Sequence, residues 1–195
     1  SGLASHLREL IRNARLTVSR NVNTLQVLTN FLIGKTIVEH EQQGKQRAIY
    51  GAKQLASVSK KLTKEFGRGY SVDNLQLIRE FYLTYSARIH IIYETLSRKF
   101  RGEQKYETLS RKSQKALSTA LISKSSVPIS ETASGISSNE KHLLQLTWSH
   151  FVLLMKMDEA ERRFYEIETT ANIWSIRELE RQYNSSLYER LVLSR

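Results

Sequence analysis

Residues 7–32 read LRELIRNARLTVSRNVNTLQVLTNFL, and their apolar side chains recur at alternating steps of four and three. The heptad spacing holds for nearly four repeats, at Leu7, Ile11, Ala14, Val18, Asn21, Leu25, Leu28 and Leu32. Such spacing is typical of a long helix that packs along one seam against another helix. Since neither proline nor glycine occurs between residue 7 and Gly34, we expect one long helix here, or two with a slight break.

One polar residue, Asn21, lies within this seam of mostly apolar side chains. A single buried Asn can fix register and oligomeric state in a coiled coil, at some cost in stability. We therefore expect self-association, as a homodimer or a higher oligomer, through a seam made of Leu7, Ile11, Val18, Asn21, Leu25, Leu28 and Leu32. The alternative is that this stripe packs on later helices of the same chain.

The composition of the 195-residue chain argues against catalysis. The absence of cysteine excludes disulfides, thiolate zinc sites, iron–sulfur clusters and a cysteine nucleophile. Only two aspartates occur, Asp73 and Asp158, whereas most hydrolases need clustered carboxylates. We expect no catalytic residue, no metal and no cofactor. No stretch reaches the roughly 18 consecutive apolar residues of a membrane span, so we expect a cytoplasmic protein without a membrane partner.

The positive charge is concentrated in the first two thirds of the chain. The net charge of +11 divides into +7 for residues 1–85, +5 for 86–139 and −1 for 140–195. The densest basic run consists of Lys45, Arg47, Lys53, Lys60, Lys61, Lys64 and Arg68. A confined excess of this kind favours a surface that meets a polyanion. The alternative is a solvated helix face that happens to be rich in lysine.

The low content of proline and glycine predicts an all-α fold, with two helical halves joined by a flexible linker. We place the first half at residues 1–96 and the second at 139–195. Between them, residues 97–138 form a basic linker rich in Ser, Thr and Lys. The segment YETLSRK occurs at 93–99 and again at 106–112, which indicates a small local duplication that lengthened the connection.

Start signals predict the later helices. Ser137 followed by Glu140 is a capping-box pattern, and the residues after it, up to Met155, are apolar nearly all round, which predicts one buried helix. Similar patterns begin at Asp158 and Ser175. His150 lies within the apolar stretch, and we interpret it as a hydrogen-bonded core residue rather than a metal ligand or a catalytic group.

Two places combine a helix, a short turn and an aromatic-Ser-β-branched start to the next helix, as a helix-turn-helix does. The first lies at about residues 48–85 and contains Tyr70-Ser71-Val72; the second contains Trp174-Ser175-Ile176. In the first unit we expect duplex DNA to contact Lys53, Lys60, Lys61, Lys64, Arg68, Ser71, Asn74, Gln76 and Arg79. The exposed residues of the second unit, Arg177, Glu178, Glu180 and Arg181, suit protein contact better.

Several of these stretches also resemble the N-terminal domain of the YhcG-type family of bacterial PD-(D/E)XK nucleases. The similar residues are Ile33–Glu39, Gly69–Leu75, Arg79–Tyr82, Leu146–His150, Trp174–Gln182 and Leu187–Leu191. The resemblance implies a helical domain that bears a helix-turn-helix and precedes a nuclease domain. It also implies a role in defence against phage or other foreign DNA.

The nuclease motif itself does not occur in this chain. That motif needs Pro-Asp followed by Asp/Glu-x-Lys to hold a divalent metal, but the only proline, Pro128, precedes Ile129. We expect this chain to be the portion that precedes the nuclease domain, with that domain as its partner in the full-length protein. Our first hypothesis is a DNA-binding and assembly module; the alternative is a scaffold that positions the nuclease without touching DNA.

Overall fold

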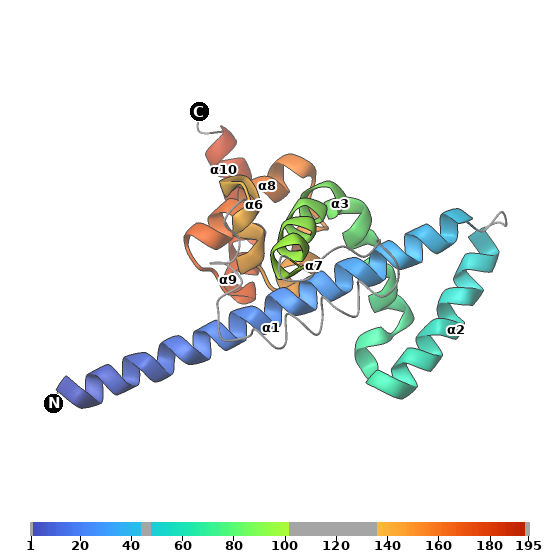
Figure 1. The fold of residues 1–195 in the computed structure, drawn as a ribbon. Helices are drawn as coiled ribbons and strands as arrows, with labels where there is room; N and C mark the ends of the chain where they lie inside the picture. Colours follow the sequence, from blue (N-terminus) through green and yellow to red (C-terminus); the bar gives the residue numbers. More distant parts are fainter. Residues whose placement is uncertain (1, 44–47, 102–135, 194–195) are drawn as a thin grey trace. The chain divides into compact units, whose positions relative to one another are not determined.

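The computed structural model describes residues 2–43, 48–101 and 136–193, and the regular elements in these ranges are helices. The all-α fold class is therefore confirmed. In chain order the elements are α1 (Gly2–Gln43), α2 (Ala48–Phe66), the 3-10 helix η1 (Arg68–Tyr70), α3 (Val72–Arg101), α6 (Ser138–Lys141), the 3-10 helix η2 (His142–Gln145), α7 (Trp148–Leu154), α8 (Glu159–Ala171), α9 (Ile176–Asn184) and α10 (Leu187–Leu193) (Figure 1). Within the described ranges no helix is both long and apolar enough to cross a membrane.

The described chain divides into two compact units, residues 28–86 and residues 1–27 with 87–195. Both α1 and α3 are continuous helices that contribute to each unit. The predicted linker at 97–138 and the second YETLSRK copy fall mostly outside the described residues. The sequence-based division into 1–96, 97–138 and 139–195 therefore stays a prediction.

Helix α1 confirms the expected long N-terminal helix and continues past Gly34 to Gln43. Helix α1 continues through Gly34, and this glycine permits close packing in the unit of residues 28–86. A Cβ atom at this position would lie 2.4 Å from the carbonyl oxygen of Ile78 and 2.8 Å from the Cβ of Tyr82. Only glycine allows α1 and α3 to approach so closely.

The core of the unit of residues 28–86 is aromatic and aliphatic. Its fully buried side chains are Phe31, Leu75, Ile78, Phe81 and Tyr85. The Phe31 and Tyr82 rings pack with centroids 5.2 Å apart, which adds to the contact between α1 and α3. The apolar face of α2 is buried only in part, since Val58 and Phe66 are exposed.

In the other unit, the residues from Ser137 to Met155 do not form the single buried helix that their apolar composition predicts. The chain forms α6 and η2, becomes extended at Leu146, and starts again as α7 with a capping box at Thr147. Leu146 is itself buried, as are Phe151 and Leu154 of α7. The prediction of a buried core segment is thus right, whereas its continuity is wrong because Thr147 offers a competing helix start.

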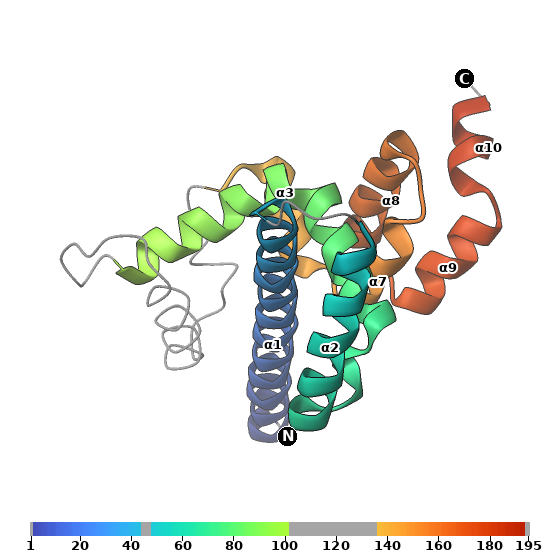
Figure 2. The ribbon, with the colours of Figure 1, turned by 90° about the vertical axis from the view of Figure 1, so that its right-hand side faces the viewer.

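The C-terminal helices of this unit are joined through the hydroxyl of Tyr165 on α8. It donates to the carbonyl oxygen of Gln182 at 3.2 Å and accepts from the backbone N–H of Tyr188 at 3.3 Å. The Tyr165 side chain is fully buried. This single hydroxyl therefore ties α8 to α9 and α10, which follow it in the chain (Figure 2).

Candidate nucleic-acid interface

A basic surface runs along α2 and into the turn that follows it. The side chains of Lys53, Lys60, Lys61, Lys64 and Arg68 are all exposed. At 100° per residue, Lys53, Lys60 and Lys64 share one side of α2, and Lys61 lies on the neighbouring side. Within the described residues no carboxylate pairs with these cations. We call these five residues the α2 basic face; the sequence predicts them as DNA contacts, and the structure leaves them accessible.

The turn between α2 and α3 is held in place by local interactions. Gly67 has φ +93°, a conformation that favours glycine, and its N–H donates to the carbonyl oxygen of Thr63 at 3.0 Å. The buried hydroxyl of Ser59 donates to the carbonyl oxygen of Tyr70 at 2.9 Å. The rings of Phe66 and Tyr70 meet edge to face. Arg68 is therefore presented from an ordered turn next to α2.

Ser71 and Asn74, two of the predicted DNA contacts, take part in starting α3. The Ser71 hydroxyl accepts from the backbone N–H of Asn74 at 3.3 Å, as an N-cap does. The Asn74 amide donates in turn to the carbonyl oxygen of Gly69. Gln76, two residues beyond Asn74, is exposed, as is Ser71. The caps position the start of α3 and leave the Gln76 side chain exposed beside them.

Arg79, the last predicted contact, is held by an acidic partner that the sequence did not indicate. Its Nε donates to Oε2 of Glu41 on α1 at 2.7 Å, and both side chains are partly exposed. Glu41 lies 38 positions away in the chain, so no local pattern signals the pair. The charge of Arg79 is therefore neutralised by Glu41, unlike the charges of the α2 basic face.

The second helix-turn-helix-like unit, α8 to α9, carries a surface of mixed charge. The predicted caps are present: Asp158 accepts from the N–H of Glu161 at 2.9 Å, and Ser175 accepts from the N–H of Glu178 at 3.3 Å. Arg181 donates to Glu178 at 2.6 Å, and this hydrogen bond lowers the pKa of the partly exposed Glu178 carboxyl. Internally paired charges of this kind attract a polyanion weakly.

His150 is a structural residue, as its apolar setting indicates. Its Nδ1 accepts from the backbone N–H of Thr147 at 3.1 Å, completing the capping box of α7. Burial lowers the pKa of His150 below its ordinary value of 6.5. Across the described ranges no group of three or more His, Asp or Glu side chains could hold a metal ion.

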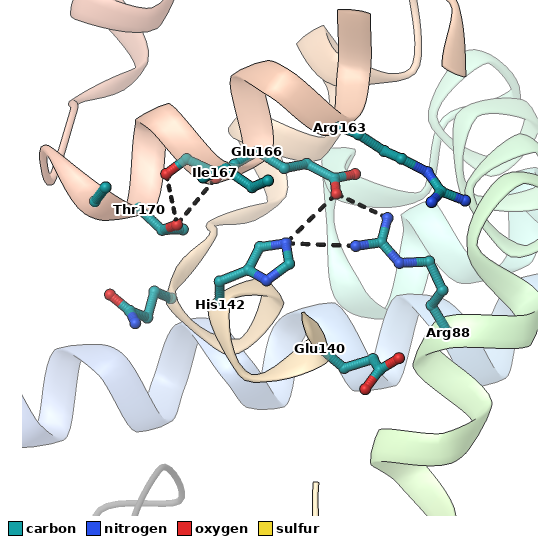
Figure 3. A pocket seen from close by; sticks show the side chains of 9 residues that line it. Arg88, Glu140, His142, Arg163, Glu166, Ile167 and Thr170 are labelled. Atoms are coloured by element: carbon teal, nitrogen blue, oxygen red, sulfur yellow. Dashed lines mark hydrogen bonds and ion pairs between the residues drawn. The ribbon is translucent and has the colours of Figure 1, made fainter. Parts of the chain in front are cut away.

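A charged cluster at the floor of a cavity of about 650 Å³ has no counterpart in the sequence analysis. Arg88 on α3 donates to the fully buried Glu166 carboxylate on α8 at 2.7 Å. His142 Nε2 lies 3.5 Å from the same oxygen and 3.4 Å from Arg88 (Figure 3). Arg88 precedes Glu166 by 78 residues, so no sequence spacing points to the cluster. Since its charges balance, the cluster braces α3, η2 and α8 rather than forming an anion site.

Comparisons with known proteins agree with the resemblance that the motifs predict. The family described as "DUF1016 N-terminal domain" matches residues 6–190. A protein of Escherichia coli (strain K12) named "Putative nuclease YhcG" is 35% identical over 189 residues. These residues make up 95% of this chain but 44% of that protein, so the chain spans less than half the length of this curated relative. No solved structure gave a significant match.

Proposed function

The chain belongs to the DUF1016 N-terminal domain family, and from this membership we propose that it is the DNA-binding and assembly module of a nuclease-type bacterial protein. A relative named as a nuclease makes nucleic acid the natural partner class. In this proposal the module binds duplex DNA and positions a nuclease domain that lies outside the chain. It acts in the cytoplasm, in defence against phage or other foreign DNA.

The observation that carries the proposal is the α2 basic face, with its exposed and unneutralised side chains. Exposed Lys and Arg side chains bind phosphates with little desolvation cost and release condensed counterions. The adjoining turn and the start of α3 present Gln76, whose amide can hydrogen-bond base edges. The α8–α9 unit, with its internally paired charges, is the weaker candidate for DNA and suits protein contact.

Catalysis has no place in this proposal. Only Asp73 and Asp158 occur among the aspartates, and neither stands in a PD-(D/E)XK setting. Strand cleavage by that motif needs carboxylates that hold a divalent metal at the scissile phosphate. The chemistry therefore belongs to the nuclease domain of the longer protein, and this chain contributes binding and assembly.

Self-association through α1 is the second part of the proposal. Of the predicted seam, Asn21 and Leu28 are buried within the chain itself, and Leu25 and Leu32 are half-buried. Leu7, Ile11 and Val18 are exposed, so only the N-terminal part of the seam is available to a partner. The rival function, a scaffold that assembles without touching DNA, rests on this same apolar surface.

A salt titration of duplex DNA binding tests the proposal. We expect the affinity, measured by fluorescence polarisation, to fall steeply with salt. Replacing Lys60, Lys61 and Lys64 together by Glu should abolish binding at physiological salt and reduce the magnitude of the log–log salt slope by about three. The lysines are exposed, so the fold should persist, which circular dichroism checks.

The matched control changes net charge equally at another surface. Lys141, Lys156 and Arg177 are exposed residues of the other unit, and replacing them by Glu alters the charge by the same amount. This variant should retain most of the affinity. If both triple variants lose binding equally, net charge alone drives it; if wild-type protein does not bind, the scaffold function is favoured.

A further inference from the structure

The N-terminal part of α1 carries an apolar stripe that no described helix covers. Leu3, Leu7, Leu10, Ile11, Ala14 and Val18 lie within about 120° of one another on the helix surface. All are exposed, with exposed fractions of 74% for Leu3 and 47–56% for Leu7, Leu10, Ile11 and Val18. Figure 1 shows this part of α1 extending away from the other helices of its own unit. We call these six residues the α1 stripe.

A helix segment with an exposed apolar face is stabilised by packing against a partner. Between Gly2 and Arg20 every described side chain is exposed except Thr17, which is half-buried. Most helix stability in proteins comes from packing of an apolar face, so a partner on this face would stabilise the N-terminal part of α1. An apolar surface of this extent on a helix typically marks an interaction site.

We infer that the occupant of the α1 stripe is the same stripe of a second copy, aligned in parallel; this rests on the self-association proposed above. Ile11 and Val18 occupy one heptad seam position, and Leu7 and Ala14 occupy the other. Among parallel coiled coils, β-branched residues at the first position with Leu at the second, as Ile11 and Leu7 provide here, favour two strands over three or four.

The charges beside the stripe select the parallel orientation. One border carries Arg8 and Arg15, whereas the opposite border carries the uncharged side chains of Asn13 and Thr17. In a parallel pair the arginine border of one helix faces the uncharged border of the other. An antiparallel pair sets arginine border against arginine border, with Arg8 near Arg15 of the second copy. Such like-charge juxtapositions disfavour that arrangement.

The interface ends near Val18, and Asn21 has no role in it. Asn21 is buried within its own unit, and Thr24, one turn later, donates through its hydroxyl to the carbonyl oxygen of Leu144 at 3.2 Å. From Asn21 onward, one side of α1 is buried within its own chain. Register in the paired helices therefore follows from the stripe and its borders rather than from a buried Asn.

A molecular-mass measurement tests whether the stripe pairs at all. By light scattering we expect the 195-residue chain to show about twice the 22.6 kDa mass of one copy. Replacing Leu7 and Ile11 by Asp should give the single-copy mass with unchanged helicity elsewhere. Replacing Ser5 and Arg12, which lie on other sides of α1, by Asp should leave the doubled mass in place. A single-copy mass for the wild-type chain overturns the inference and would mean that another segment of the chain covers the stripe.

Disulfide cross-linking then tests the orientation, which is simple because the natural chain has no cysteine. In a parallel pair, Leu7→Cys lies opposite itself and should form a disulfide-linked dimer under mild oxidation. In an antiparallel pair Leu7 would face Val18 of the second copy, about 16 Å from the other Leu7. The matched control Arg12→Cys, on the outer side of α1, should cross-link at least about five-fold less.

The outcomes distinguish self-association of α1 from the parallel orientation of the pair. A doubled mass with Leu7→Cys cross-linking to itself supports the parallel pair. A doubled mass in which Leu7→Cys links only to Val18→Cys, in a mixture of the two variants, overturns the orientation and leaves self-association standing. DNA binding by the lysine variant is measured in a separate experiment. A failure of the DNA-binding proposal can therefore be distinguished from a failure of α1 pairing.

Discussion

Arg79 on α3 and Glu41 on α1 form an ion pair with Nε and Oε2 2.7 Å apart. Arg79 lies one turn beyond Gln76, on the helix that follows the α2 basic face. In the proposed function, Glu41 would compete with DNA phosphates for a cation that the sequence alone presents as free. This relationship allows the contribution of a single masked cation to DNA binding to be measured.

Replacing Glu41 by Gln should strengthen DNA binding by releasing Arg79. We expect roughly a five-fold gain at low salt and a salt slope steeper by about 0.9, as for one added phosphate contact. Fluorescence polarisation across a salt series measures both quantities. Glu39→Gln removes the same charge from a position about half a turn away from Glu41 on α1, where Glu39 pairs with Lys35 at 3.7 Å. An equal gain from Glu39→Gln would contradict the role assigned to Arg79.

Replacing Gly34 by Ala should destabilise the unit of residues 28–86. The new Cβ would lie 2.4 Å from the Ile78 carbonyl oxygen, and a backbone atom cannot move aside as a flexible side chain can. Overpacking of this kind costs about 1–3 kcal/mol, more than the gain of about 1 kcal/mol from removing a helical glycine. Urea denaturation measures the change. At Gly69 a Cβ meets nothing within 4 Å, so Gly69→Ala should change stability by less than about 0.5 kcal/mol.

Replacing Glu166 by Ala should destabilise the other unit by about 3–5 kcal/mol, because it leaves Arg88 largely buried without its carboxylate partner. Glu159 provides a matched comparison on the same helix. It pairs with Arg163 at 2.6 Å, but both side chains are well exposed. Such a pair contributes no more than about 1 kcal/mol, so Glu159→Ala should be nearly neutral. Similar losses from the two variants, measured by thermal or urea unfolding, would refute the bracing role of the cluster.

His150 should make folding stability depend on pH. Burial holds its pKa in the folded state below the ordinary value of 6.5, so the unfolded chain binds the proton more tightly. The stabilisation is complete above pH 6.5 and is lost as the pH falls through the folded-state pKa. Protonation of Nδ1 would also remove the acceptor for Thr147.

The variant His150→Gln tests this dependence, since its amide oxygen can replace the acceptor without titrating. Between pH 7.5 and about pH 5 the wild type should lose more stability than His150→Gln in urea denaturation. His90 is exposed, and His90→Gln should retain the pH dependence of the wild type. Parallel curves for wild type and His150→Gln would exclude His150 as the source.

Sequence patterns predicted the secondary structure correctly wherever neighbouring residues determine it. The heptad spacing predicts α1, and Ser71 and Asp158 predict helix starts. The continuity of the segment from Ser137 to Met155 was mispredicted, because apolar periodicity does not reveal that Thr147 and His150 would cap a new helix. Local hydrogen bonds of that kind outweigh a weak helical preference.

The candidate interface was predictable only in part. Lys60, Lys61 and Lys64 follow from helical spacing, because a surface position on an amphipathic helix depends on few neighbours. The pairing of Arg79 with Glu41, and of Arg88 with Glu166, depends on helices brought together from distant parts of the chain. Charge in a sequence therefore indicates a basic region but does not say which cations are already neutralised.

The sequence by itself determined the all-α class, the long first helix, the family and the concentration of positive charge before residue 140. These properties depend on composition and on spacings of a few residues. Only the tertiary structure decided that the seam of α1 divides near Asn21, with its later residues turned toward the chain's own core and its earlier ones exposed. The periodicity is the same on both sides of Asn21, but burial depends on which other helices lie alongside, and that is a property of the packed chain.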